Sequence, residues 1–165
     1  MAAEPRVRVI NGPNLNMLGA REPSVYGTQT LDDVDALCRE RGQALGLAVS
    51  CCQSNHEGEL VELVQGARAV ADGLIVNAGA YTHTSIALLD ALRAAALPCV
   101  EVHLSNIFQR EAFRHTSYIS PAALGVISGF GAAGYTYALD ALATHLASNR
   151  APATVGEEDR AHGQR

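Results

Sequence analysis

The sequence contains no lysine, since all 12 of its basic residues are arginines. A chain without lysine cannot form a Schiff base with a carbonyl substrate, and it cannot hold pyridoxal phosphate in the usual way. It also cannot supply the lysine of a Walker A phosphate loop. Any carbonyl chemistry in this protein must therefore proceed without an imine.

Long apolar runs and basic clusters are also missing. No uncharged apolar stretch is long enough to span a bilayer, and the first residues, MAAEPRVRV, lack the apolar region of a secretory signal. The net charge is −5 without a basic run, which argues against nucleic acid as a partner. The four cysteines have apolar neighbours and no CxxC spacing, as is typical of reduced core thiols. We therefore expect a cytoplasmic protein that binds neither membrane nor nucleic acid.

The 165 residues are enough for one domain with its own core, and β-rich apolar runs alternate with amphipathic segments along them. In the segment 84–95, we expect Ile86, Leu89 and Leu92 to face the core. Residues 149–165 have no apolar period and are predicted to be a disordered tail, which leaves 1–148 as the domain. The predicted strands are residues 7–10, 48–53, 73–76, 99–104 and 125–128. The predicted helices run from the N-cap Thr30 to about Leu45 and over residues 59–71, 84–95 and 135–147.

Strands that alternate with helices predict an α/β fold with a parallel sheet covered on both faces. Right-handed crossovers favour the flavodoxin-like order 2-1-3-4-5, in which ligands bind beyond the carboxyl ends of the strands. Three of the predicted strands end in polar residues: the first in NGPNLNMLGAREPSVYG (11–27), the third in NAGAYTHTS (77–85) and the fourth in EVHLSN (101–106). We expect these three strand ends to meet in one pocket.

A candidate general acid lies on the fourth predicted strand. Glu101 and His103 are two residues apart, so their side chains share a face. A carboxylate beside an imidazole favours its protonated form and fixes its tautomer. His56, His83 and His103 are alternatively candidate metal ligands. No HExxH or HxH spacing supports that reading, and each lies in a different segment.

The long loop after the first strand carries a candidate base. Arg21 and Tyr26 would be a solvated charge and a packing tyrosine in an arbitrary loop, but this loop is long enough to fold over a pocket as a lid. A tyrosine is a useful base only if its pKa falls from about 10 towards about 7, which requires about 4 kcal/mol. One guanidinium about 4 Å away supplies about that much at an effective dielectric constant near 20. Arg110 or Arg114 could add to the effect of Arg21, and Asn14 is a neutral donor for a water or an oxyanion. A tyrosine base, a histidine acid and amide donors together suggest proton abstraction beside a carbonyl.

The glycine motif GFGAAG at 129–134 matches the dinucleotide fingerprint GxGxxG, but it follows the last predicted strand. No later strand can carry the acid that binds the ribose, so a tight turn and close helix packing explain the motif better. No GxSxG elbow is present, so covalent acyl chemistry is not supported. Two other functions remain open: a binding module for FMN or another phosphate, and a metal-assisted lyase or hydrolase.

Six segments resemble the type II 3-dehydroquinate dehydratases and occur in the order of that family. They are NGPNLNMLGAREPSVYG, SNHEGEL (54–60), NAGAYTHTS, EVHLSN, FRHTSY (113–118) and GFGAAGY (129–135). The resemblance covers about residues 7–146. It implies a flavodoxin-like subunit, a dodecamer of four trimers and no cofactor. The implied reaction is a reversible anti dehydration of 3-dehydroquinate to 3-dehydroshikimate through an enolate, in the shikimate pathway.

The resemblance also implies roles for individual residues. Tyr26 would remove the C2 proton, with Arg21 tuning it, and Asn14 would stabilise the enolate through a water. His103 would protonate the departing C1 hydroxyl, with Glu101 behind it. The absence of lysine agrees with this reaction, because the unrelated type I enzymes use a lysine imine. Substrate binding would fall to Asn77, Leu104 (through its backbone) and Ser105 at the carboxylate, and to His83, Arg114 and Asp90 at the ring hydroxyls, with Asp90 approaching the site of an adjacent subunit.

Overall fold

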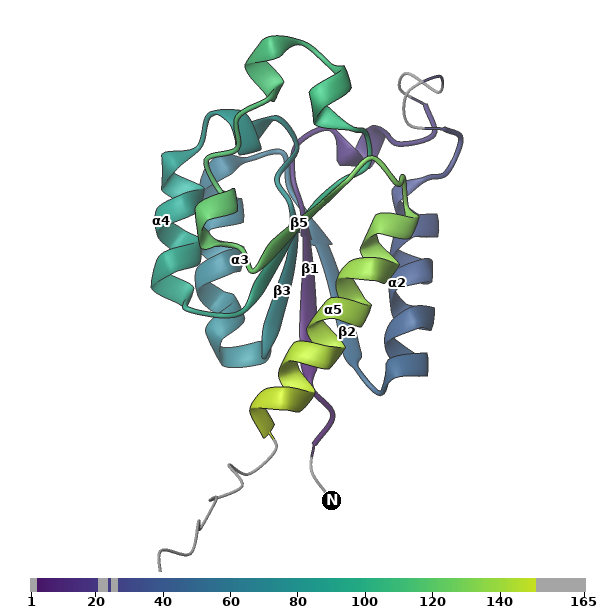
Figure 1. Ribbon diagram of the computed structural model, residues 1–165, viewed down its shortest axis with the longest axis vertical. Helices are drawn as coiled ribbons and strands as arrows, with labels where there is room; N and C mark the ends of the chain where they lie inside the picture. The colour runs from purple at the N-terminus through teal and green to yellow at the C-terminus, as the bar shows by residue number, and fades with distance from the viewer. Residues whose placement is uncertain (1–2, 21–23, 25–26, 151–165) are drawn as a thin grey trace, which may run out of the picture.

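The computed structural model describes residues 3–20, 24 and 27–150. A five-stranded parallel sheet with the order β2-β1-β3-β4-β5 forms its centre (Figure 1). This is the predicted flavodoxin-like order, and every strand agrees with its predicted bounds to within one residue. The strands are β1 (Arg6–Asn11), β2 (Ala48–Gln53), β3 (Gly73–Asn77), β4 (Cys99–His103) and β5 (Gly125–Ser128).

Two pairs of helices cover the two faces of the sheet. The helices are α2 (Leu31–Leu45), α3 (Glu57–Val70), α4 (Ile86–Ala95) and α5 (Ala133–Arg150). α2 and α5 pack together on one face and α3 and α4 on the other (Figure 1). α2 begins with a capping box, because the Thr30 hydroxyl accepts from the Asp33 backbone while the Asp33 carboxylate accepts from the Thr30 backbone.

The core consists of two clusters of buried apolar side chains, one on each face of the sheet. β3 lies at the centre and is buried over its whole length, which is why its sequence reads as a continuous apolar run. Ile75 packs towards α2 and α5, whereas Leu74 and Val76 pack towards α3 and α4. The four cysteines are free; Cys38 and Cys99 are buried, as expected for core thiols, whereas Cys51 and Cys52 are only partly buried.

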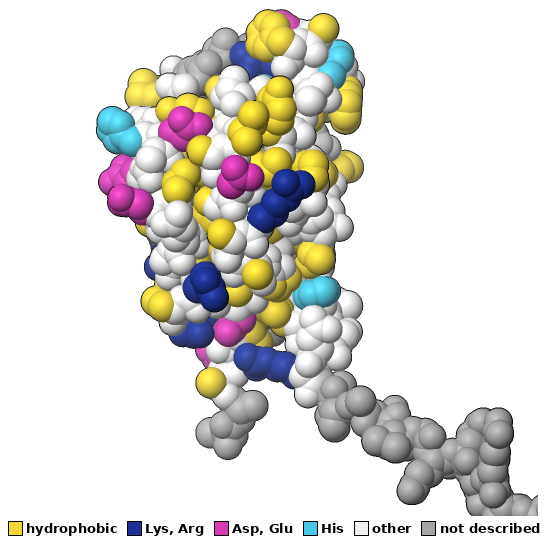
Figure 2. All heavy atoms as spheres, turned by 90° about the vertical axis from the view of Figure 1, so that its left-hand side faces the viewer, with side chains coloured by type: hydrophobic (Ala, Val, Ile, Leu, Met, Phe, Trp, Pro, Cys, Tyr) yellow, Lys and Arg dark blue, Asp and Glu magenta, His cyan; other side chains and the backbone are white. Residues whose placement is uncertain are grey.

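The prediction for α4 was partly wrong. Ser85 is its N-cap and accepts a hydrogen bond from the backbone N–H of Leu88 at 2.9 Å, so the helix begins two residues later than predicted. Leu89 and Leu92 are buried as expected, but Ile86 is 58% exposed. At 3.6 residues per turn, Ile86 lies on the opposite side of the helix from Leu88, the first buried residue within α4. Figure 2 shows this outer face, where acidic and arginine side chains lie among hydrophobic ones.

The last helix, α5, is longer than predicted. It continues through Asn149 and Arg150, which the sequence had assigned to the tail. The remaining residues of the expected tail, 151–165, lie outside the described part of the chain. No helix in the described ranges is long and apolar enough to cross a membrane.

Candidate active site

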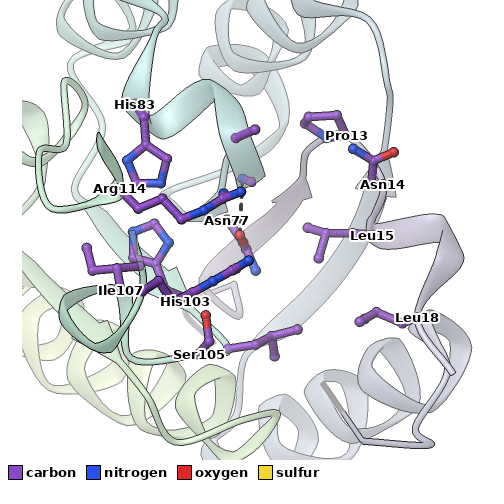
Figure 3. Close-up of a pocket in the computed structure, with 14 residues that line it drawn as sticks. Pro13, Asn14, Leu15, Leu18, Asn77, His83, His103, Ser105, Ile107 and Arg114 are labelled. Carbon is purple, nitrogen blue, oxygen red and sulfur yellow. Dashed lines mark hydrogen bonds between the residues drawn. The ribbon is translucent and has the colours of Figure 1, made fainter. Parts of the chain in front are cut away.

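A pocket lies beyond the carboxyl ends of β1, β3 and β4, where the sequence predicts that three polar strand ends meet (Figure 3). It contains about 720 Å³ of empty space, part of it open to solvent. The residues that line it are Pro13, Asn14, Leu15, Leu18, Asn77, Gly79, Ala80, His83, His103, Leu104, Ser105, Ile107, Arg110 and Arg114.

Close backbone packing joins the loops that leave β1 and β3. The N–H of Gly12 donates to the carbonyl of Asn77 at 2.7 Å. A Cβ atom on Gly12 would lie 2.4 Å from the carbonyl oxygen of Ala78, so only glycine allows this approach. The two loops therefore leave the sheet side by side and form adjacent walls of the pocket.

Asn14 is held in a left-handed backbone conformation, with φ of 66°. Its N–H donates to Oδ1 of Asn55 at 2.9 Å, and the same oxygen accepts from Nε2 of Gln53 at 3.2 Å. The Tyr81 hydroxyl donates to the backbone carbonyl of Asn55 at 2.9 Å. Asn55 follows β2, so a fourth strand end supports the site. Sequence reasoning missed this contribution, although the motif SNHEGEL contains the residue.

The amide of Asn77 is oriented by a buried chain of hydrogen bonds. Its Nδ2 donates to the Tyr135 hydroxyl at 2.9 Å, which donates in turn to Oδ1 of Asn11 at 2.6 Å. Oδ1 of Asn77 accepts from the N–H of Gly79 at 3.2 Å. Burial raises the pKa of Tyr135, so its ring remains a neutral phenol that can both donate and accept. Sequence reasoning treated Tyr135 only as the start of a helix.

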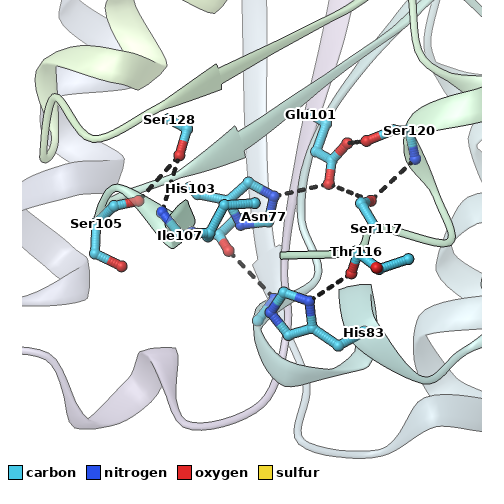
Figure 4. A network of polar contacts seen from close by, with 11 residues as sticks. Asn77, His83, Glu101, His103, Ser105, Ile107, Thr116, Ser117, Ser120 and Ser128 are labelled. Carbon is cyan, nitrogen blue, oxygen red and sulfur yellow. Dashed lines mark hydrogen bonds and ion pairs between the residues drawn. The ribbon is translucent and has the colours of Figure 1, made fainter. Parts of the chain in front are cut away.

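His103 and Glu101 form a buried pair, as their spacing on the strand predicts (Figure 4). Nε2 of His103 lies 2.7 Å from Oε1 of Glu101. Two serines donate to the carboxylate as well: Ser117 to Oε1 at 2.6 Å, and Ser120 to Oε2. Burial raises the pKa of Glu101, but the hydrogen bonds from His103, Ser117 and Ser120 outweigh it and hold that pKa below its usual range. An ionised Glu101 only accepts, so the proton between the two residues is on Nε2 of His103.

His83 lies next to this pair in the pocket. Its Nδ1 is 2.8 Å from the carbonyl oxygen of Thr116, which can only accept, so Nδ1 carries a proton. The rings of His83 and His103 are stacked, with centroids 6.5 Å apart. In the neutral form of His83, its Nε2 is therefore a hydrogen-bond acceptor.

The segment after β4 is fixed by the glycine turn that follows β5. The carbonyl of Leu104 accepts from the N–H of Gly131 at 2.9 Å, and Gly131 has a φ of 57°. The Ser128 hydroxyl donates to the carbonyl of Ser105 at 3.1 Å. A Cβ atom on Gly134 would lie 3.3 Å from a methyl group of Ile127, so the helix packs closely on the sheet. The turn and the close packing are the explanation that the sequence favoured for GxGxxG.

Two arginines make the rim of the pocket basic. Nε of Arg114 donates to the carboxylate of Glu111 at 2.8 Å, and Nε of Arg110 lies 3.7 Å from it. The Arg114 guanidinium also lies over the ring of Phe113, 5.1 Å from its centroid. Both arginines keep their charge at any physiological pH and favour an anionic ligand.

Three of the predicted candidates, Asp90, His56 and Glu101, do not line this pocket, although Glu101 hydrogen-bonds to His103, which does. Asp90 is exposed on α4 and does not line it. Arg21 and Tyr26 lie outside the described residues. His56 is an exposed residue at the start of α3, away from His83 and His103 in the pocket lining. Within the described ranges, no three or more His, Cys, Asp or Glu side chains form a group that could hold a metal ion.

Comparisons with known proteins agree with one another. Residues 5–143 match the family model described as dehydroquinase class II. The chain is 58% identical over 140 residues to a 3-dehydroquinate dehydratase of Dinoroseobacter shibae, with 85% of this chain and 93% of the relative covered. It is 61% identical over 140 residues to a 3-dehydroquinate dehydratase of Ruegeria pomeroyi, with 85% and 94% covered.

Two solved structures of type II dehydroquinases are also similar to this chain. The type II dehydroquinase from Propionibacterium acnes superposes with a TM-score of 0.82 at 43% identity, covering 87% of this chain and 98% of the other. The type II dehydroquinase from Butyrivibrio crossotus superposes with a TM-score of 0.83 at 41% identity, covering 86% and 99%.

Proposed function

The chain belongs to the class II dehydroquinase family, and on that premise we propose how its own residues carry out the reaction. It is a type II 3-dehydroquinate dehydratase, a lyase that converts 3-dehydroquinate into 3-dehydroshikimate in the shikimate pathway. The reaction breaks a C–H bond at C2 and the C–O bond at C1. It therefore needs a base at one carbon and an acid at the other.

The base in this proposal is Tyr26, which takes the C2 proton. Arg21 stabilises its tyrosinate form, since a guanidinium remains charged at every relevant pH. The resulting enolate oxygen is stabilised through a water held by Asn14. The fixed backbone of Asn14, tied to Asn55 at 2.9 Å, supports this role because it places the amide at the pocket without further ordering.

The acid is His103, which protonates the C1 hydroxyl so that this group leaves as water. In an anti elimination it acts on the face of the substrate opposite to the one from which Tyr26 takes the proton. Its Nε2 is committed to Glu101 at 2.7 Å, so Nδ1 supplies the proton. The carboxylate of Glu101 stabilises the positive charge that His103 carries before the transfer. The single observation that carries the proposal is this buried pair, in which His103 lines the pocket and Glu101 hydrogen-bonds to it from the interior of the sheet.

Substrate binding follows from the groups around the acid. The substrate carboxylate is bound by Asn77, by the backbone of Leu104 and by Ser105, all of which line the pocket. The ring hydroxyls are bound by the acceptor Nε2 of His83 and by Arg114. No cofactor takes part, because acid and base are both side chains.

Asp90 completes the site from an adjacent subunit in this proposal. It is exposed on the outer face of α4 beside Ile86, one helical turn away, and does not line its own pocket. The family resemblance assigns this acid to the site of an adjacent subunit, and its exposure on α4 leaves it available for that contact. We therefore propose a trimer as the functional unit and a cytoplasmic dodecamer of four trimers as the assembly.

The test is the ultraviolet absorbance of the enone that forms when purified enzyme meets 3-dehydroquinate, with chelator present and after borohydride treatment. We expect the product to form at the same rate in every case. Tyr26→Phe should abolish turnover while it still binds substrate in equilibrium dialysis. Tyr137→Phe, at an exposed tyrosine on α5, is the matched control and should be fully active. Full activity of Tyr26→Phe would remove the proposed base, and loss of activity with chelator would indicate a metal-assisted lyase.

A further inference from the structure

Residues 116–120 contact His83 directly and His103 through Glu101, and the proposed reaction gives this segment no role (Figure 4). We propose that Ser117 and Ser120 are positioning residues, which hold the carboxylate of Glu101 in the one orientation that serves His103. The proposal rests on the proposed function, because the purpose of this orientation is proton transfer by His103.

Two contacts that do not involve the serine hydroxyls anchor the segment. Ile119 is 1% exposed and packs into the cluster beneath α3 and α4. The N–H of Tyr118 donates to the carbonyl of Thr82 at 2.8 Å. The N–H of Ser120 donates to the Ser117 hydroxyl oxygen at 3.1 Å, which leaves the proton of that hydroxyl for Glu101. The serines are therefore presented from a fixed backbone.

The three donors occupy both oxygens of the carboxylate. Oε1 of Glu101 accepts from His103 at 2.7 Å and from Ser117 at 2.6 Å, while Oε2 accepts from Ser120. A carboxylate bound through one oxygen can still rotate about its terminal torsion, which is broad and roughly two-fold. Donors on both oxygens fix its plane, and with it the angle at which Oε1 meets the imidazole.

Among the residues that the structure describes, the side chains that donate to Glu101 are His103, Ser117 and Ser120. The residues paired with Glu101 on β3 and β5 are Val76 and Val126. The titratable neighbours are His103 and Cys99 on the same strand, with His83 stacked beyond His103. Burial, followed by the charge of Glu101, raises the pKa of Cys99 to about 12, so that thiol remains neutral. The serines therefore supply the hydroxyl donors that keep a fully buried Glu101 ionised.

The first experiment measures the ionisation of Glu101 directly and does not depend on turnover. Glutamate is labelled with ¹³C at the side-chain carboxyl, the Glu101 signal is assigned by its loss in Glu101→Gln, and the protein is titrated with acid. In Ser117→Ala/Ser120→Ala we expect Glu101 to take up its proton at a higher pH than in the wild type. Each single alanine variant should shift in the same direction by less. An unchanged titration in all three would overturn the proposal.

Ser85→Ala is the matched control. Ser85 is a buried serine whose hydroxyl caps α4 by accepting from Leu88, and it does not contact Glu101. This variant should lose some stability while the titration of Glu101 stays at its wild-type position. A shift in Ser85→Ala as large as that in the double variant would show that general loosening moves Glu101, and it would count against the proposal.

The second experiment is a mutant cycle on turnover. Ser117→Ala/Ser120→Ala should lower kcat on the order of 10-fold, which is a fraction of what general acid catalysis contributes, with KM changed less than about twofold. In a Glu101→Gln background the same pair should lower kcat by less than about twofold, because the serines act through the carboxylate. A 10-fold loss of kcat in both backgrounds would show that the serines do not act through the Glu101 carboxylate, and it would overturn the proposal. If the wild type does not convert 3-dehydroquinate at all, the proposed function fails, and the titration alone decides whether the serines hold Glu101.

Discussion

Glu101 and Asp72 are two carboxylates towards opposite ends of the same sheet, and they differ in burial and in the groups that donate hydrogen bonds to them. Glu101 is the third of the five residues of β4, is fully buried, and accepts from the side chains of His103, Ser117 and Ser120, which lie at the carboxyl end of the sheet or after it. Asp72 lies just before β3 and accepts from the backbone N–H of Arg6 at 2.7 Å and from its guanidinium at 3.4 Å. The side chains of this second pair are 48% exposed for Arg6 and 32% exposed for Asp72.

Both carboxylates have a pKa below the usual range, but for different reasons. For Asp72 the backbone hydrogen bond from Arg6 is the main cause. For Glu101, burial acts in the opposite direction and three side-chain donors overcome it. A partly exposed ion pair contributes about 0–1 kcal/mol, whereas a buried polar network is costly whenever one member is removed. The amino end of the sheet should therefore tolerate the loss of its carboxylate, and the carboxyl end should not.

The largest expected effect is on turnover in Glu101→Gln. Glutamine keeps the shape of the side chain but removes the charge that stabilises protonated His103. We expect kcat to fall at least about 100-fold, within the range for a general acid that has lost its support. The enone assay measures this loss, and circular dichroism checks the fold. Asp72→Asn is the matched control at the other end of the sheet and should keep the wild-type kcat.

A Glu101→Gln enzyme with more than about a tenth of the wild-type kcat would contradict this difference. In that case His103 would transfer its proton without an ionised partner. The buried pair would then serve the structure alone, and the carboxyl end of the sheet would tolerate the loss of its carboxylate as the amino end does.

The second prediction concerns stability at the carboxyl end. Tyr135→Phe removes the hydroxyl between Asn11 and Asn77, which leaves two buried amides without that partner. We expect the free energy of unfolding to fall by about 1–3 kcal/mol in urea titrations. Tyr137→Phe should change it by less than about 0.5 kcal/mol, because Tyr137 is 48% exposed. Equal effects of the two variants would mean that the buried chain contributes no more than a surface ring.

The sequence correctly predicted the features that follow from the regular repeat of strands and from the alternation of strands with helices. Glu101 and His103 share a face because side chains alternate along a strand, and their hydrogen bond confirms this. The strand order follows from alternating strands and helices. In contrast, Ile86 was assigned to the core because it is apolar and three residues before Leu89, yet it is exposed.

The supporting residues could not be predicted, because they depend on contacts between distant segments. Tyr135 reaches Asn11 across 124 residues of sequence. Ser117 and Asn55 lie in loops without a hydrophobic period, so no pattern indicates where their side chains point. The family resemblance included their motifs but assigned them no role. The proposed roles of Tyr26 and Arg21 stay predictions, since both lie outside the described residues.

The third prediction concerns stability in acid. Because the pKa of Glu101 is lowered in the folded protein, its interactions stabilise the fold above the ordinary glutamate range near pH 4.3. This stabilisation is lost as the pH falls through the lowered value. We expect the wild type to lose free energy of unfolding more steeply than Glu101→Gln between about pH 5 and pH 3. Parallel curves in urea titrations across this range would contradict the ionised, buried state of Glu101.

The smallest expected effect is that of Asp72→Asn on stability. Asparagine keeps an oxygen that can accept from the backbone N–H of Arg6, so only the charge is lost. We expect the free energy of unfolding to fall by less than about 1 kcal/mol, and the difference should shrink in about 1 M salt, which screens an exposed pair. Urea titrations at low and high salt measure both effects. A larger loss than in Tyr135→Phe, or one that salt does not reduce, would mean that Asp72 holds the starts of β1 and β3 together as firmly as the buried network holds their ends.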